Sequence, residues 1–92
     1  MPLASKRHTA GDSRWWTVKY DRCLKNGAKI DTMDITSNST SCTVSDTEIL
    51  GPDVRFRLNG GTVGERVTVS LEMNDDAGNV KNDTIIFTVI SP

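Results

Sequence analysis

The sequence is poor in the residues on which most catalytic and metal sites depend. It contains one histidine, two cysteines and 5% aromatic residues in a chain of 92. The histidine, His8, lies in a polar N-terminal stretch, where we expect an ordinary solvated residue that is not held as a general base. The serines then lack an oriented base, and two cysteines with one histidine cannot complete a four-ligand zinc site. We expect a protein that is not an enzyme, with no catalytic residues, no cofactor and no metal.

Long apolar runs and a strong charge of one sign are also missing. No run approaches the length of a membrane helix, and residues 1–8 lack the apolar core of a signal peptide. The net charge of −1 argues against electrostatic binding of nucleic acid. We therefore expect no nucleic-acid partner, no membrane partner, and synthesis in the cytoplasm.

The two cysteines leave a disulfide open. Cys42 alternates with Val44 in a short strand-like pattern, so we expect it to face the core, and Cys23 lies beside Leu24 in a turn-like stretch. Cytosolic synthesis favours two reduced thiols over a disulfide, and buried free cysteine is common in proteins.

Apolar and polar residues alternate strictly in the second half of the chain. The apolar residues occupy every second position over 54–58, 67–73 and 85–89. A period of two places one set of side chains on the buried face of a β-strand, and the glycines from 60 to 64 mark a reversal between the first two strands. We expect a core made of one of the two tryptophans and of Val54, Phe56, Val67, Val69, Leu71, Ile85, Phe87 and Val89.

The whole chain divides into an arm and one domain. Residues 1–13 are polar and without periodicity, so we predict a flexible N-terminal arm that either frays or orders against a neighbouring subunit. Residues 14–92 contain about six or seven short strands at spacings near ten residues. This spacing predicts an all-β fold, an immunoglobulin-like antiparallel β-sandwich.

Two irregularities are predicted inside the sandwich. Ile30 is out of phase with the apolar residues that follow it, which indicates a bulge or bend near residues 31–32. Residues 46–52 lack alternation, and we predict a loop there that places Ile49 and Leu50 on the core.

Adjacent tryptophans open the first predicted strand, over residues 15–20. Alternation puts the indoles of Trp15 and Trp16 on opposite faces of this strand. One of them belongs to the core. The other is either covered by the rest of the chain or exposed for a partner, so both are candidate partner-binding residues.

Arginines provide the other candidate partner-binding residues. Arg55 and Arg57 alternate along one strand and can form a basic stripe with Arg66 across paired strands. Such a stripe would meet an acidic partner surface, unless Glu65, Glu72 and neighbouring acids neutralise it. We therefore name Arg55 and Arg57, with the two tryptophans, as the site residues.

An acidic stretch is the one place where the sequence offers ligands to a metal. Residues 74–79 and Asp83 supply carboxylate and amide oxygens, which calcium prefers. The spacing is not that of an EF-hand, since no glutamate follows at the required distance. The same residue types tolerate the positive φ angles of a tight turn, and we favour a plain turn.

The segment 54–69 resembles a motif of small structural proteins of tailed bacteriophages. In that motif a hydrophobic strand is followed by Gly-Gly-Thr, a small residue, Gly and an alternating Thr/Val strand, as in Gly60-Gly61-Thr62-Val63-Gly64. A glycine turn and a final strand follow, matched by residues 76–79 and 84–89. The resemblance extends over residues 18–89. The family is known as phage fiber-tail adaptor, or immunoglobulin-like virion, proteins.

The resemblance implies a non-enzymatic virion structural protein that decorates the capsid or joins tail components. Its partners would be phage capsid or tail proteins, and its location the virion, after synthesis in the cytoplasm of the host bacterium. In isolation we expect a monomer or a weak oligomer. The alternative is a stand-alone adhesion or carbohydrate-binding β-sandwich module, in which Trp15 or Trp16 stacks on a sugar.

Overall fold

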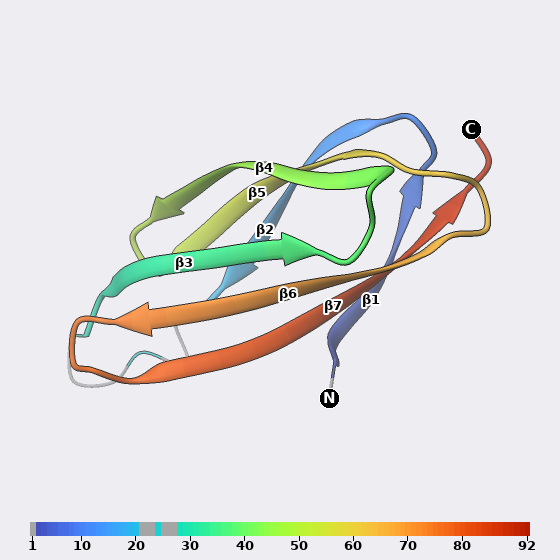
Figure 1. Ribbon diagram of the computed structural model, residues 1–92. Helices are drawn as coiled ribbons and strands as arrows, with labels where there is room; N and C mark the ends of the chain where they lie inside the picture. Colours follow the sequence, from blue (N-terminus) through green and yellow to red (C-terminus); the bar gives the residue numbers. More distant parts are fainter. Residues whose placement is uncertain (1, 21–23, 25–27) are drawn as a thin grey trace.

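The computed structural model describes residues 2–20, 24 and 28–92. Over these residues the chain forms seven strands and no helix (Figure 1). The strands are β1 Pro2–Thr9, β2 Ser13–Lys19, β3 Ile30–Ser37, β4 Cys42–Leu50, β5 Asp53–Gly60, β6 Arg66–Asp75 and β7 Val80–Ile90. In this described part of the chain, no helix is long and apolar enough to cross a membrane.

The strands form two sheets that face each other (Figure 1). One sheet has four strands in the order β1-β7-β6-β3, and the other has three in the order β2-β5-β4. Neighbouring strands are antiparallel, except that β1 runs parallel to β7. With β2, β5 and β4 in one sheet and β3, β6 and β7 in the other, the strand order is that of an immunoglobulin-like sandwich. The predicted fold class is confirmed, with one parallel pair that the sequence did not predict.

The glycines after β5 connect the two sheets and do not form a hairpin. We expected β5 and β6 to pair, but β5 pairs with β2 and β4, and β6 pairs with β3 and β7. Gly60 has a φ of +83°, and a Cβ there would lie 2.5 Å from the carbonyl oxygen of Ser41. Only glycine allows this close approach of the β5 end to the loop after β3. β5 and β6 therefore lie in different sheets, on opposite sides of the core.

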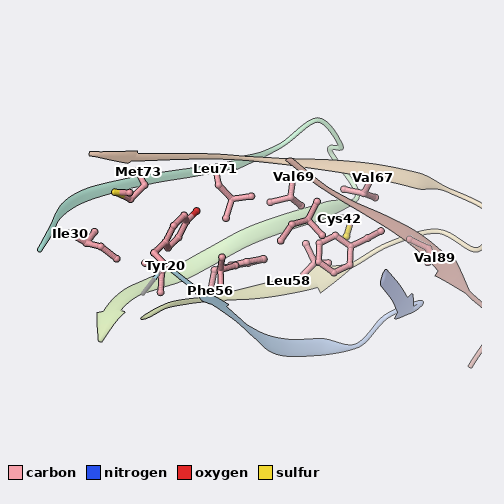
Figure 2. Packing of buried hydrophobic residues seen from close by; sticks show 14 residues of the cluster. Tyr20, Ile30, Cys42, Phe56, Leu58, Val67, Val69, Leu71, Met73 and Val89 are labelled. Carbon is pink, nitrogen blue, oxygen red and sulfur yellow. The ribbon is translucent and has the colours of Figure 1, made fainter. Parts of the chain in front are cut away.

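A hydrophobic core fills the space between the sheets (Figure 2). All eight aliphatic and aromatic positions predicted for it are buried, and Trp16 packs against it. A fully buried side chain of this kind stabilises the fold by roughly 1.5–3 kcal/mol. Cys42 lies in the core as a free thiol, and Cys23, the partner considered for a disulfide, lies outside the described residues. The core also includes Val18, Tyr20, Ile30, Leu58 and Met73.

Residues 2–9 form the strand β1, where the sequence predicted part of a flexible arm over 1–13. β1 pairs with β7 in a register that aligns His8 with Val89. The His8 side chain, which we expected to be solvated, is fully buried, and its Nε2 lies 3.0 Å from the carbonyl oxygen of Gly60. The expectation for His8 was wrong because backbone pairing with a sheet edge needs no apolar alternation, so it leaves no pattern in the sequence.

Two bulges interrupt the side of the sandwich formed by β3 and β4. In β3 the register shifts directly after Ile30, as the sequence predicted. In β4 it shifts around Asp46, whose φ is +54°. The strand then continues through most of the predicted loop over 46–52, and Ile49 and Leu50 are exposed, not part of the core. This loop prediction was wrong because the extra residue of a bulge breaks the period of two.

Candidate functional site

The two tryptophans of β2 lie on opposite faces of the three-stranded sheet, as alternation predicts. Trp16 faces the core and packs edge to face against Phe87, with 5.0 Å between the ring centroids. Trp15 lies on the outer face and is 37% exposed. The sheet therefore separates two of the candidate residues, and Trp15 is the one that a partner can reach.

Two arginines of β5 lie against the Trp15 ring. Arg57 is the cross-strand neighbour of Trp15, and Arg55 lies two residues earlier in β5. The guanidinium carbons of Arg55 and Arg57 are 4.3 Å and 4.8 Å from the ring centroid. A cation this close to an indole is attracted by its π-electrons, by roughly 0.5–1 kcal/mol at exposed sites. Three of the four predicted site residues are thus in contact on one face.

Acidic residues of β4 hold the same two arginines from the other side. Glu48 Oε2 lies 2.6 Å from an Nη of Arg55, and Asp46 Oδ2 lies 3.8 Å from an Nη of Arg57. All four side chains are more than a third exposed, so each pair contributes no more than about 1 kcal/mol. We call Trp15, Arg55, Arg57, Asp46 and Glu48 together the arginine–tryptophan surface.

Arg66 does not belong to this surface. It lies on β6 in the other sheet, so the basic stripe expected from Arg55, Arg57 and Arg66 does not form. The acids that pair with the arginines lie on β4 and are not the expected Glu65 and Glu72. The sequence did not indicate them, because the bulge in β4 concealed both the strand and its pairing with β5.

A row of hydrogen bonds continues the outer face of the three-stranded sheet. Ser13 Oγ donates to Asn59 Oδ1 at 2.6 Å, and Asn59 Nδ2 donates to Ser45 Oγ at 2.8 Å. The three residues come from β2, β5 and β4, so the row crosses the whole sheet. Side chains already held by their neighbours lose less conformational entropy when a partner binds. This face is therefore ordered in advance of any contact.

A second polar cluster joins the loops that follow β3 and β5. The Glu65 carboxylate accepts hydrogen bonds from the Ser39 hydroxyl, from Ser41 Oγ at 2.8 Å and from the N–H of Thr62 at 3.2 Å. These bonds, the one from Ser39 first, lower the pKa of Glu65. Burial, with a smaller effect of the Glu65 charge, raises the pKa of the Cys42 thiol. A thiol kept protonated is a poor nucleophile, so the cluster fastens the loops together and offers no activated nucleophile.

The acidic stretch predicted as a tight turn joins β6 to β7. Asp75 Oδ1 accepts hydrogen bonds from the N–H groups of Asn79 at 2.8 Å and Ala77 at 3.0 Å, and Oδ2 accepts one from Asn79 Nδ2 at 3.1 Å. The bond from the Asn79 backbone is the main reason that the pKa of Asp75 is lowered. This carboxylate therefore holds the turn. Among the residues that the structure describes, no group of three or more His, Cys, Asp or Glu side chains is placed to hold a metal ion.

A protein-family model matches most of the chain. The model of a family described as Gp77, podophage GP4 fiber-tail adaptor protein gp77, matches residues 8–88. The matched span begins at the buried His8, ends within β7 and includes the whole arginine–tryptophan surface. A search of curated proteins found no match.

Proposed function

The chain belongs to the podophage GP4 fiber-tail adaptor family, and from this premise we propose that its arginine–tryptophan surface is the contact through which it joins a fiber to the tail. Membership of the family implies a component of the virion that binds other phage tail proteins. The proposal adds to this a role at the tail, in preference to decoration of the capsid, and a named surface for the contact.

The composition of the arginine–tryptophan surface supports a protein contact. Tryptophan and arginine are the side chains found most often at the energetic centres of protein interfaces. Here Trp15 is a large exposed apolar residue, and the two guanidinium groups beside it are held by carboxylates of β4. The surface lies on a rigid sheet backed by the core, so little order has to be gained on binding. We accordingly propose a structural, non-catalytic role.

The alternative of a sugar-binding module is less well supported. Stacking on a sugar needs a free aromatic face. Both guanidinium groups lie within 5 Å of the Trp15 ring centroid, at 4.3 Å and 4.8 Å, and cover part of its face. Trp16 faces the core and is not placed to stack on a sugar.

The test is the incorporation of a Trp15→Ala variant into virions. A phage that lacks the gene would be grown in cells that supply either the wild-type protein or the variant. We expect Trp15→Ala to melt at nearly the wild-type temperature, because this ring lies outside the core, and to give particles that lack both the protein and the fibers.

Val63→Ala is the matched control. Val63 is also an exposed apolar residue, with 56% of its surface accessible, but it lies in the loop after β5. We expect this variant to be incorporated like the wild type. Particles with normal amounts of protein and fibers in the Trp15→Ala sample would show that the contact lies elsewhere.

A further inference from the structure

Charged residues at the two sides of the sandwich are segregated by sign. The described strands β1 and β2 contain no acidic residue, and their cationic residues are Lys6, Arg7, Arg14 and Lys19. The described strands β3 and β4 contain no lysine or arginine, and their acidic residues are Asp31, Asp34, Asp46 and Glu48. All of these side chains are exposed apart from Glu48, which is half-buried.

These four strands are the edges of the two sheets. β1 and β3 are the outer strands of the four-stranded sheet, and β2 and β4 are the outer strands of the three-stranded sheet. β3 and β4 are in contact at one side of the sandwich, so β1 and β2 lie at the other. The short turn that joins β1 and β2 carries one acidic residue, the half-buried Asp12. We call the edge formed by β1 and β2 the basic side, and the edge formed by β3 and β4 the acidic side.

Most of these charges have no partner in the described part of the chain. None of the cations of the basic side takes part in an ion pair there, and neither do Asp31 and Asp34 of the acidic side. Asp34 also lies directly opposite Glu72 in the register of β3 and β6. Like charges in such cross-strand positions disfavour the folded state. Pairing within the molecule therefore accounts for Asp46 and Glu48 but not for Asp31 and Asp34, which a contact outside the molecule would pair.

We propose that copies of this chain associate edge to edge, with the basic side of one copy against the acidic side of the next. The occupant of each side is a second copy of the chain, because the chain itself carries both of the complementary surfaces. Complementary charge of this kind steers association and fixes which surfaces meet. The contact lies at the sheet edges, whereas the contact to another tail protein proposed above centres on Trp15 on the outer face of the three-stranded sheet. Asp46 and Glu48 border both surfaces.

The shape of the acidic side indicates how the copies touch. Both of its strands carry a bulge, after Ile30 in β3 and around Asp46 in β4. Bulges break the regular ladder that an added strand would need, so the contact is made by charged side chains and does not extend either sheet. Because the two sides differ, the contact is head to tail and repeats from copy to copy until the series closes on itself.

Sedimentation velocity of the purified protein tests this inference without any other tail protein. At low ionic strength we expect association that rises with concentration. It should disappear near 1 M salt, where the screening length falls to about 3 Å. A protein that stays monomeric at the lowest ionic strength and the highest concentration reached would overturn the inference, and it would leave the Trp15 result unaffected.

Charge reversal identifies the surfaces. We expect Lys6→Glu/Arg14→Glu on the basic side, and Asp31→Lys/Asp34→Lys on the acidic side, each to weaken association by more than about tenfold. Mixed together, the two variants should associate again, because each then carries the complement of the other. Thermal unfolding confirms that both are folded. Folded variants that stay monomeric when mixed contradict the inference.

A variant with the same change in charge as Lys6→Glu/Arg14→Glu, placed away from the edges, is the matched control. Arg66→Glu/Lys81→Glu alters β6 and β7. It should associate by itself like the wild-type protein. If this control loses association as the basic-side variant does, net charge and not the two sides governs it, and the inference fails.

Discussion

Hydrogen bonds to one carboxylate link the stability of the protein to pH. The donors on Glu65, with Ser39 first, hold its pKa below the ordinary value, and the unfolded chain has an ordinary glutamate with a pKa of about 4.3. The folded state therefore binds the proton less readily. This contribution to stability is complete above the unfolded pKa and is lost as the pH falls through the lower, folded pKa.

A Glu65→Gln variant tests this linkage. We expect it to melt below the wild-type temperature at pH 7, and we expect the difference to shrink as the pH is lowered past 4. Thermal unfolding followed across this pH range is the measurement. Glu72→Gln is the control, because the Glu72 carboxylate is exposed and accepts no hydrogen bond from the described residues. Since Glu72 lies opposite Asp34, the melting temperature of this control should not fall below that of the wild type at pH 7. A difference between Glu65→Gln and wild type that does not change with pH would contradict the linkage.

The strand β1 is the element whose role differs most from its predicted one. A flexible arm could lose any side chain without effect on stability. In the structure, His8 is fully buried and contacts Gly60, whereas its neighbour Arg7 is exposed. We expect His8→Ala to lower the free energy of unfolding by about 1–3 kcal/mol, since it empties a buried site and removes a partner from a carbonyl group.

Arg7→Ala is the control on the same strand, and denaturant unfolding measures both variants. This control should unfold like the wild type. If His8→Ala also unfolds like the wild type, β1 contributes nothing to the folded state and the arm expected over residues 1–13 is the better description. Removal of residues 1–9 should be at least as destabilising as His8→Ala, because it also exposes the edge of β7.

Alternation predicted the elements that bury one face and leave the other to solvent. β6 alternates over its whole length, β5 over residues 53–59 and β7 over residues 84–90. The sequence did not predict β1, because pairing of its backbone with β7 determines this strand. It predicted β4 too short, because a bulge interrupts the alternation there. The pairing of β5 with β2 is long-range, and a glycine turn between two alternating runs fits a hairpin and an inter-sheet connection equally well.

The candidate site was predicted in part, for a related reason. Trp15, Arg55 and Arg57 were recognisable because large aromatic and cationic residues on an outer face have no role in the core. That they touch one another depends on which strands pair, as does the position of Asp46 and Glu48 beside the arginines. Residue types therefore indicated which side chains belong to the surface, but only the order of the strands in the sheet shows that they are neighbours.

At the scale of the whole molecule, aromatic contacts couple the two sheets. Phe87 of the four-stranded sheet packs edge to face against Phe56 and Trp16 of the three-stranded sheet, with ring centroids 6.5 Å and 5.0 Å away. Because these rings pack against one another across the two sheets, the loss of either sheet removes packing contacts from the other. We therefore expect a single cooperative transition, in which circular dichroism of the sheets and tryptophan fluorescence change together.

Phe87→Ala is the variant that tests this coupling. Truncating a buried phenylalanine costs about 3–5 kcal/mol, a large part of the 5–15 kcal/mol typical of a small domain. We expect the melting temperature to fall by more than about 10 °C, with both signals still changing together. Ile86→Ala, on the outward face of the same strand, should cost much less because Ile86 is only half-buried. If the two variants melt alike, or if the two signals separate, the sheets do not depend on one shared core.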